Sequence, residues 1–75
     1  MKRKVYGKTT KFVFVREVTP AGTYCYVVKL RCWLTLDEEA QMYQVLPKSQ
    51  WQGNVAYFDK YANANRVFLM LALTL

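Results

Sequence analysis

Two stretches near the start of the chain have the hydrophobic pattern of β-strands. Residues 4–18 are rich in Val, Phe, Tyr and Thr, the residue types that favour strands. Residues 12–15 are apolar at every position, which predicts cover on both faces, one of them by a partner if need be. In residues 24–35, apolar side chains alternate with mixed ones. The apolar face comprises Tyr24, Tyr26, Val28, Leu30, Cys32 and Leu34. We expect this face to be core.

The residues between these stretches predict a tight turn. Pro20 has the fixed φ that suits the second position of a turn. Gly22 can adopt the left-handed conformation that completes a type I turn followed by a bulge. We therefore expect residues 4–18 and 24–35 to form a β-hairpin.

A helix is predicted over residues 36–46. Thr35 and Glu38 have the spacing of a capping box, and the acids at 37–39 complement the positive end of a helix dipole. Pro47 disfavours helix at the residue before it, so the helix should end there. The face expected to pack on the sheet comprises Leu36, Ala40, Tyr43 and Leu46.

The last third of the chain allows two interpretations. Residues 55–61 and 66–75 can form two strands around a turn at 63–65, because an Asn-rich break separates two apolar runs. Residues 69–73 are also good helix formers, so a C-terminal helix is the alternative. A last strand that is apolar on both faces predicts a homodimer through this strand, or indicates that the chain is a fragment.

Together these elements predict one α+β domain over residues 1–75, with the order ββαββ. It would be a small antiparallel sheet with one helix packed on it. An OB-like small barrel is the alternative if residues 4–18 bend into two strands.

Charge is concentrated at the start of the chain. The first 16 residues carry six cations and no acid, which equals the net charge of +6, while the remaining residues balance. Such a segment is typical of nucleic-acid binding. It also suits an exposed edge strand that must not pair with other chains, or a contact with an acidic protein surface.

Two groups of residues are candidate binding surfaces. Lys29, Arg31 and Trp33 share the mixed face of the second strand, where cations can meet phosphates and a ring can stack on a base. Alternatively, Trp33 covers core and the two cations lie over it. The nucleic-acid-binding candidates are Lys2, Arg3, Lys4, Lys8, Lys11, Arg16, Lys29, Arg31 and Trp33. The protein-interface candidates, which can instead be core aromatics, are Trp51, Tyr57, Phe58, Tyr61, Arg66 and Phe68.

The residues offer little for catalysis or metal binding. There is no His, and the only Ser has no base beside it in sequence. On one strand, Cys25 and Cys32 would lie about 23 Å apart on opposite faces, which excludes a disulfide or a shared zinc site. We expect a non-enzymatic protein with no cofactor or metal. Residues 67–75 are too short to cross a bilayer, so we expect a cytoplasmic location without membrane contact.

The sequence therefore predicts a small basic module that binds nucleic acid through a basic and aromatic sheet face. The first alternative is a protein-binding accessory or inhibitor, of the kind mobile elements encode, that docks on a nucleic-acid-handling complex. The second alternative is a small toxin-like ribonuclease that uses Lys, Arg, Tyr and Glu.

Overall fold

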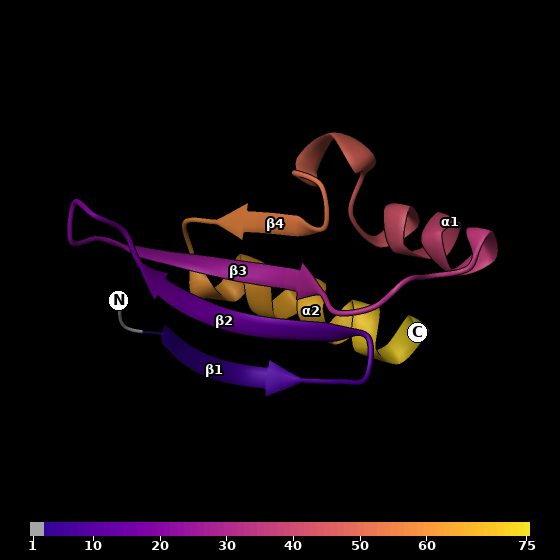
Figure 1. Cartoon of the computed structure of the whole chain (residues 1–75), viewed down its shortest axis with the longest axis horizontal. Coiled ribbons are helices and arrows are strands. Elements are labelled where there is room, and N and C mark those ends of the chain that lie inside the picture. Colours follow the sequence, from indigo (N-terminus) through magenta and orange to yellow (C-terminus); the bar gives the residue numbers. More distant parts are fainter. Residues whose placement is uncertain (1–2) are drawn as a thin grey trace.

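Four strands and two α-helices follow one another in the order β1-β2-β3-α1-β4-α2 in the computed structural model, which describes residues 3–75 (Figure 1). The bounds are β1 Arg3–Lys8, β2 Phe12–Val18, β3 Tyr24–Leu30, α1 Leu36–Val45, the short 3₁₀ helix η1 Lys48–Gln50, β4 Val55–Phe58 and α2 Tyr61–Thr74. The α+β class is confirmed. The predicted order ββαββ is wrong, because the first stretch forms two strands and the last forms a helix.

The strands form one antiparallel sheet in the order β1-β2-β3-β4. One cross-strand row shows the register: Val5 lies opposite Val15, Val15 opposite Val27, and Val27 opposite Tyr57. β1 and β4 are the two edges, so the sheet stays open and no barrel closes.

Residues 4–18 form two strands because Thr9 organises a turn between them. Its hydroxyl accepts hydrogen bonds from the backbone N–H groups of Lys11 (3.3 Å) and Phe12 (3.0 Å). Its own N–H donates to the carbonyl of Phe12 at 2.7 Å. A Thr side chain that bonds the backbone two or three residues on is a known turn-former. This local bonding outweighs the strand pattern of the whole stretch.

The turn between β2 and β3 is confirmed. Gly22 has φ +83°, and its N–H donates to the carbonyl of Thr19 at 2.9 Å. The N–H of Thr19 donates to the carbonyl of Thr23 at 2.8 Å. β3 ends at Leu30 rather than at residue 35, because the chain then leaves the sheet to reach the start of α1.

The start of α1 confirms the capping box. The Thr35 hydroxyl accepts from the N–H of Glu38 at 3.2 Å, and the Glu38 carboxylate accepts from the N–H of Thr35 at 3.0 Å. The predicted packing face is wrong at its N-terminal end, where Leu36 and Ala40 are exposed. α1 instead packs against α2, and the buried residues at its other end include Met42.

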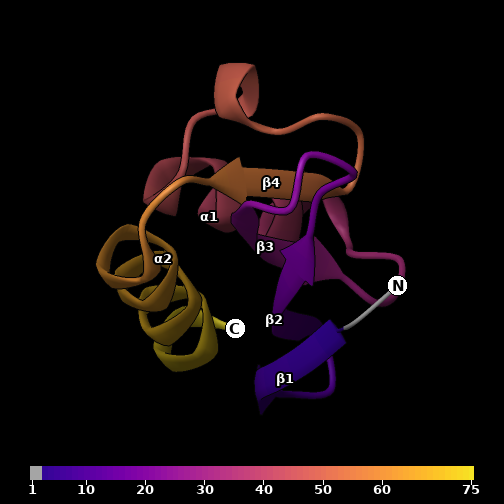
Figure 2. The same cartoon turned by 90° about the vertical axis from the view of Figure 1, so that its left-hand side faces the viewer.

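The C-terminal segment is a helix, so the predicted strand at 66–75 is wrong and β4 ends at residue 58. The buried residues of α2 are Ala64, Val67, Phe68 and Leu71. Their spacing of three and four residues is that of one helix face. Figure 2 shows α2 on one side of the sheet and, within residues 3–75, no helix on the other side. Because residues 61–74 form a helix, the prediction of a homodimer through a C-terminal strand has no basis in this fold.

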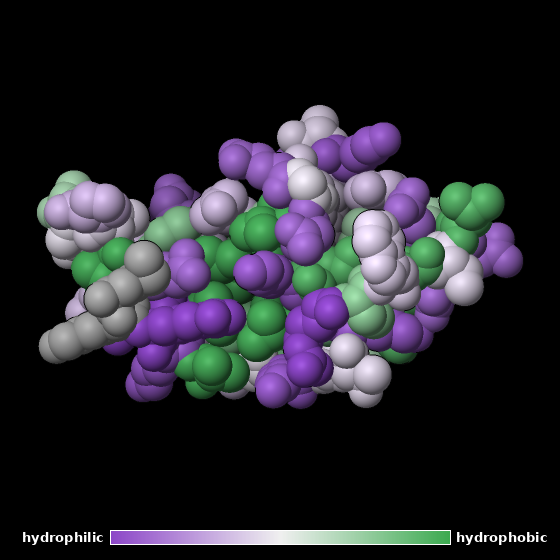
Figure 3. Space-filling model, viewed as in Figure 1, coloured by the Kyte–Doolittle hydropathy of each residue, from purple (hydrophilic) through white to green (hydrophobic). Residues whose placement is uncertain are grey.

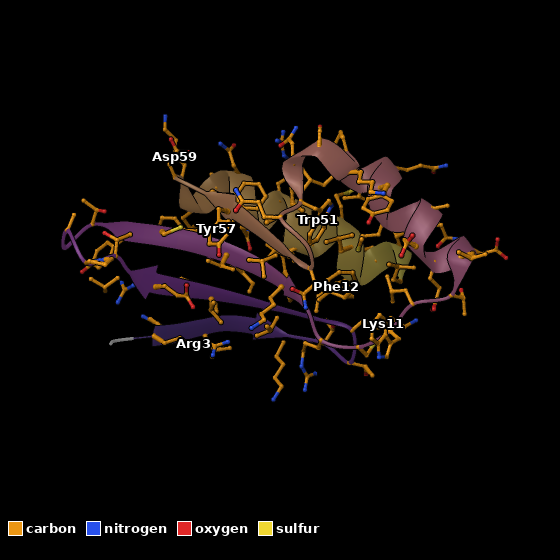
Figure 4. The ribbon with its side chains drawn as sticks, turned by 45° about the horizontal axis from the view of Figure 1, so that its top comes forward. Arg3, Lys11, Phe12, Trp51, Tyr57 and Asp59 are labelled. Carbon is orange, nitrogen blue, oxygen red and sulfur yellow. The ribbon has the colours of Figure 1, made fainter. Side chains whose placement is uncertain are left out.

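The core lies between α2 and the sheet. Phe14 is 1% exposed, and its ring centroid lies 5.7 Å from that of Phe68. A Cβ added to Gly7 would come within 2.6 Å of the Phe68 ring, so this ring can pack on the backbone of β1 only because residue 7 lacks a side chain. Trp51 joins the core beside Phe12, as Figure 4 shows, and its indole N–H donates to the carbonyl of Leu46 at 3.0 Å.

Candidate nucleic-acid interface

The side of the sheet that faces away from α2 is the candidate interface, and we call it the open face. Successive side chains of a strand alternate between the two faces, so the register defines its members. They are Arg3, Val5 and Lys8 of β1, Val13, Val15 and Glu17 of β2, Cys25, Val27 and Lys29 of β3, and Val55 and Tyr57 of β4.

The middle of the open face is apolar. Val15 and Val27 are buried although no helix covers them, because neighbouring side chains of the same face close around them. The row continues outward to Val5 (54% exposed) on one edge strand and Tyr57 (50% exposed) on the other. Figure 3 shows this face, with hydrophobic surface at its centre and hydrophilic side chains around it.

Three exposed cations stand on the same face. Lys8 and Lys29 flank Val13 in one cross-strand row, so their backbones lie about 10 Å apart, two strand spacings. Lys29 is also the diagonal neighbour of Tyr57, a position from which long side chains can interact. Arg3 lies at the other end of β1, on the sheet edge opposite Tyr57 (Figure 4).

Acidic residues lie at one end of the open face only. Glu17 lies between Arg3 and Cys25 in the register, and Asp59 follows β4 near Cys25. Burial raises the pKa of the Cys25 thiol, and the negative charge of Glu17 raises it further. The thiol is therefore protonated at neutral pH. The positive end of the open face is the end that carries Lys8 and Lys29.

The predicted nucleic-acid residues are divided between two faces. Arg3, Lys8 and Lys29 share the open face, whereas Lys4 and Arg16 point to the side of α2. Lys11 instead pairs with Glu38 of α1. Lys2 lies outside the described residues.

Lys29, Arg31 and Trp33 do not share one strand face as predicted, because β3 ends at Leu30, before Arg31 and Trp33. The guanidinium of Arg31 donates to the carbonyl of Thr9 in the β1–β2 turn. Trp33 lies in the loop before α1 and is 99% exposed. It therefore does not cover core either. Lys29 remains as the one member that stands on a sheet face.

The predicted protein-interface residues also separate. Trp51 and Phe68 are core, and Phe58 is half-buried beside the same core. Tyr57 belongs to the open face. The remaining two, Tyr61 and Arg66, are exposed on α2.

Sequence reasoning missed that Val5 and Tyr57 stand at the two ends of one cross-strand row of the open face. The alternation within residues 55–58 could have assigned Tyr57 to the face opposite Ala56, but the strand order that brings it to Lys29 is not written in that segment. Cross-strand neighbours depend on register, which the hairpin turns and the helix between β3 and β4 set together.

No protein-family model, curated protein or solved structure matches this chain. Within residues 3–75, no group of three or more His, Cys, Asp or Glu side chains is placed to hold a metal ion. No helix in the same range is both long enough and apolar enough to cross a membrane.

Proposed function

We propose that this protein binds single-stranded nucleic acid on the open face. The observation that carries the proposal is the half-exposed ring of Tyr57 with Lys29 as its diagonal neighbour and with Lys8 two strands further on, in the row of Lys29. An aromatic ring on a flat sheet can stack on a base, and cations around it can neutralise the flanking phosphates. Val5 adds apolar surface on which a second base or sugar can lie.

The net charge supports the same proposal. A chain with a net charge of +6 attracts a polyanion before contact, whichever face it uses. β1 is also an edge strand, and its cations oppose pairing with other chains. The experiment must therefore separate charge on the open face from charge elsewhere.

Fluorescence anisotropy with labelled oligouridylate and oligothymidylate, at several salt concentrations, makes this separation. In single strands each phosphate contact contributes about 0.7 to the slope of log affinity against log salt. Lys29→Gln and Lys8→Gln should each lower the slope by about that amount. The matched control is Lys48→Gln, which removes an exposed lysine on η1, away from the open face, and should leave the slope unchanged.

Tyr57→Ala should weaken binding by about 1–3 kcal/mol, the usual contribution of one stacked base. Tyr57→Phe keeps the ring and should bind nearly as well. Absence of binding at low salt would refute the proposal. An equal decrease of the salt slope in the Lys29→Gln and Lys48→Gln variants would refute it as well.

A protein-binding accessory is the second candidate, because large apolar side chains are exposed away from the open face. Leu36 and Leu73 are each 84% exposed, and Leu69 is half-exposed on α2. A separate groove of about 770 Å³ lies between α1, η1 and α2, with Gln41, Arg66 and Met70 in its wall. In a pull-down, this candidate predicts a protein partner that is still captured after nuclease treatment. The partner should be lost with the Leu69→Ser/Leu73→Ser variant and retained with Tyr57→Ala.

A further inference from the structure

A second group of rings and cations lies on the other side of the sheet, toward the end that carries the β2–β3 turn. The ring of Tyr61, the first residue of α2, lies 5.0 Å from that of Tyr6 and 5.9 Å from that of Tyr26. Tyr24 precedes Tyr26 by two residues on the same face of β3 and is 55% exposed. Tyr61 itself is 43% exposed. The aromatic packing at this end therefore reaches the surface.

Two cations lie against these rings. Lys4 and Arg16 are direct cross-strand partners on β1 and β2. The Lys4 Nζ lies 5.4 Å from the ring centroid of Tyr6, and the Arg16 Cζ lies 4.2 Å from that of Tyr24. A ring attracts a cation but does not neutralise it. Like charges directly opposite one another destabilise a sheet, so this pair has a cost that a bound anion would remove.

Within residues 3–75, neither cation forms a salt bridge. The Nε of Arg16 is moreover buried without a hydrogen-bond acceptor in that part of the chain. Buried polar groups are almost always paired with protein or ordered water, so this donor is open to a water molecule or to an oxygen of a bound group. Arginine beside an exposed ring is suited to hold a phosphate oxygen while the ring contacts the neighbouring base or sugar.

We propose that this tyrosine–cation cluster is a second contact site for the same nucleic-acid strand. We define the cluster as Lys4, Tyr6, Arg16, Tyr24, Tyr26 and Tyr61. Lys4 and Arg16 bind a phosphate, and the exposed rings of Tyr24 and Tyr61 pack on the adjoining nucleotides. This inference rests on the proposed function, because it extends the path of the nucleic-acid strand that we propose binds the open face.

The edge strand β1 joins the two sites. Its consecutive residues Arg3 and Lys4 point to opposite faces, so cations line both sides of this edge. A nucleic-acid strand that leaves the open face beside Arg3 would meet Lys4 directly after it passes the edge formed by β1. The two sites should therefore cooperate on a long oligonucleotide, whereas a short one can occupy only one of them.

Two oligothymidylates test the inference, one of about 6 and one of about 16 nucleotides, within the range of site sizes for single-strand binders of this size. The variants Lys4→Gln and Tyr24→Ala both change exposed side chains and should fold. Tyr24→Ala should weaken binding of the long oligonucleotide by roughly 5-fold or more and leave the short one unchanged. Lys4→Gln should lower the salt slope by about 0.7 for the long oligonucleotide only.

The controls separate this inference from the proposed function. Tyr24→Phe keeps the ring and should restore the affinity, and Tyr57→Ala should weaken binding of both lengths. If Tyr57→Ala weakens both lengths while Lys4→Gln and Tyr24→Ala leave the long one unchanged, the second site is wrong and the open face stands. If the unaltered protein binds neither length, both proposals fail.

Discussion

The two faces of the sheet are apolar in different ways. Toward α2 the buried residues include the large rings of Phe12 and Phe14, which fill the space between strands and helix. The open face has only valines at its centre, and Val15 and Val27 are buried by neighbours within the same face. β-Branched side chains suit this role, because they are short, stiff and pack closely on a pleated surface. A strand that is apolar on both faces is thus not proof of cover on both sides.

Phe14→Ala should destabilise the protein more than any other single substitution proposed below. It removes a ring that lies beside Phe68 and Tyr61 and should cost about 3–5 kcal/mol of unfolding free energy. Val15→Ala, the next residue on the open face, should cost only about 1–2 kcal/mol because two methylene equivalents are lost. Urea unfolding of both variants measures the difference. Equal losses would show that the two faces are equally covered.

The sequence was sufficient where one local interaction decides the structure. Gly22 and Pro20 predict the β2–β3 turn, and Thr35 with Glu38 predicts the start of α1; both are as expected. It was insufficient for α2, where Leu, Met, Val and Phe suit strand and helix alike. The sheet decides between strand and helix for this segment. Its aromatic face would be exposed without α2, and a helix with Val67 and Leu71 on one side can cover it. That requirement arises only in the assembled fold.

The candidate sites were predictable as residue types but not as groups. Charge makes Lys29 a candidate and aromatic character makes Tyr57 one, yet the sequence pattern places them on different surfaces. The pairing of β3 with β4 brings them together. Arg16 and Tyr24 likewise meet only because the turn fixes the hairpin register. Sites built across strands cannot be obtained from periodicity within one strand.

Gly7→Ala should have the next largest effect and should sharpen the comparison within a single strand. The new methyl group would lie 2.6 Å from the Phe68 ring, so either the ring or the helix that carries it must shift. The cost should be about 1–3 kcal/mol, as for other overpacked positions. Val5→Ala on the open face of the same strand should change the free energy by about 0.5 kcal/mol or less.

Phe68→Leu combined with Gly7→Ala tests the cause of this loss. A smaller side chain at position 68 should relieve part of it, which a double-mutant cycle in thermal or urea unfolding would show as a coupling energy. If the two losses simply add, the close approach of β1 to α2 is not what requires glycine.

Thr35→Ala should have a smaller effect, because it acts on α1, which lies on neither face of the sheet. The variant loses the hydroxyl that accepts from the N–H of Glu38, and a lost cap of this kind costs about 1 kcal/mol. Thr35→Ser should retain the cap and most of the stability. Circular dichroism with urea unfolding provides the measurement. A loss as large as that of Phe14→Ala would mean that the sheet depends on α1 as much as on α2.

The pH dependence of stability should show a weaker link between α1 and the sheet. The Lys11 ammonium, and then the N–H of Thr35, hold the pKa of the Glu38 carboxyl below its ordinary value of 4.5. A carboxyl whose pKa is lowered by folding stabilises the protein above its ordinary pKa and loses that contribution as pH falls through the lowered value. Melting temperatures should therefore decline below pH 4.5, and less so in Glu38→Gln. An identical decline in both proteins would assign the acid sensitivity to other carboxyls.

The two cysteines offer the mildest test, because it requires no substitution in the chain. Cys25 is half-buried on the open face and its pKa is raised by burial and by Glu17, whereas Cys32 is exposed in the loop before α1. Because only the thiolate reacts, iodoacetamide near neutral pH should modify Cys25 several-fold more slowly than Cys32. Mass spectrometry of peptides gives both rates, and in urea they should converge. Equal rates in the folded protein would mean that the side chains of the open face do not shield Cys25. Only the cover by α2 would then distinguish the two faces of the sheet.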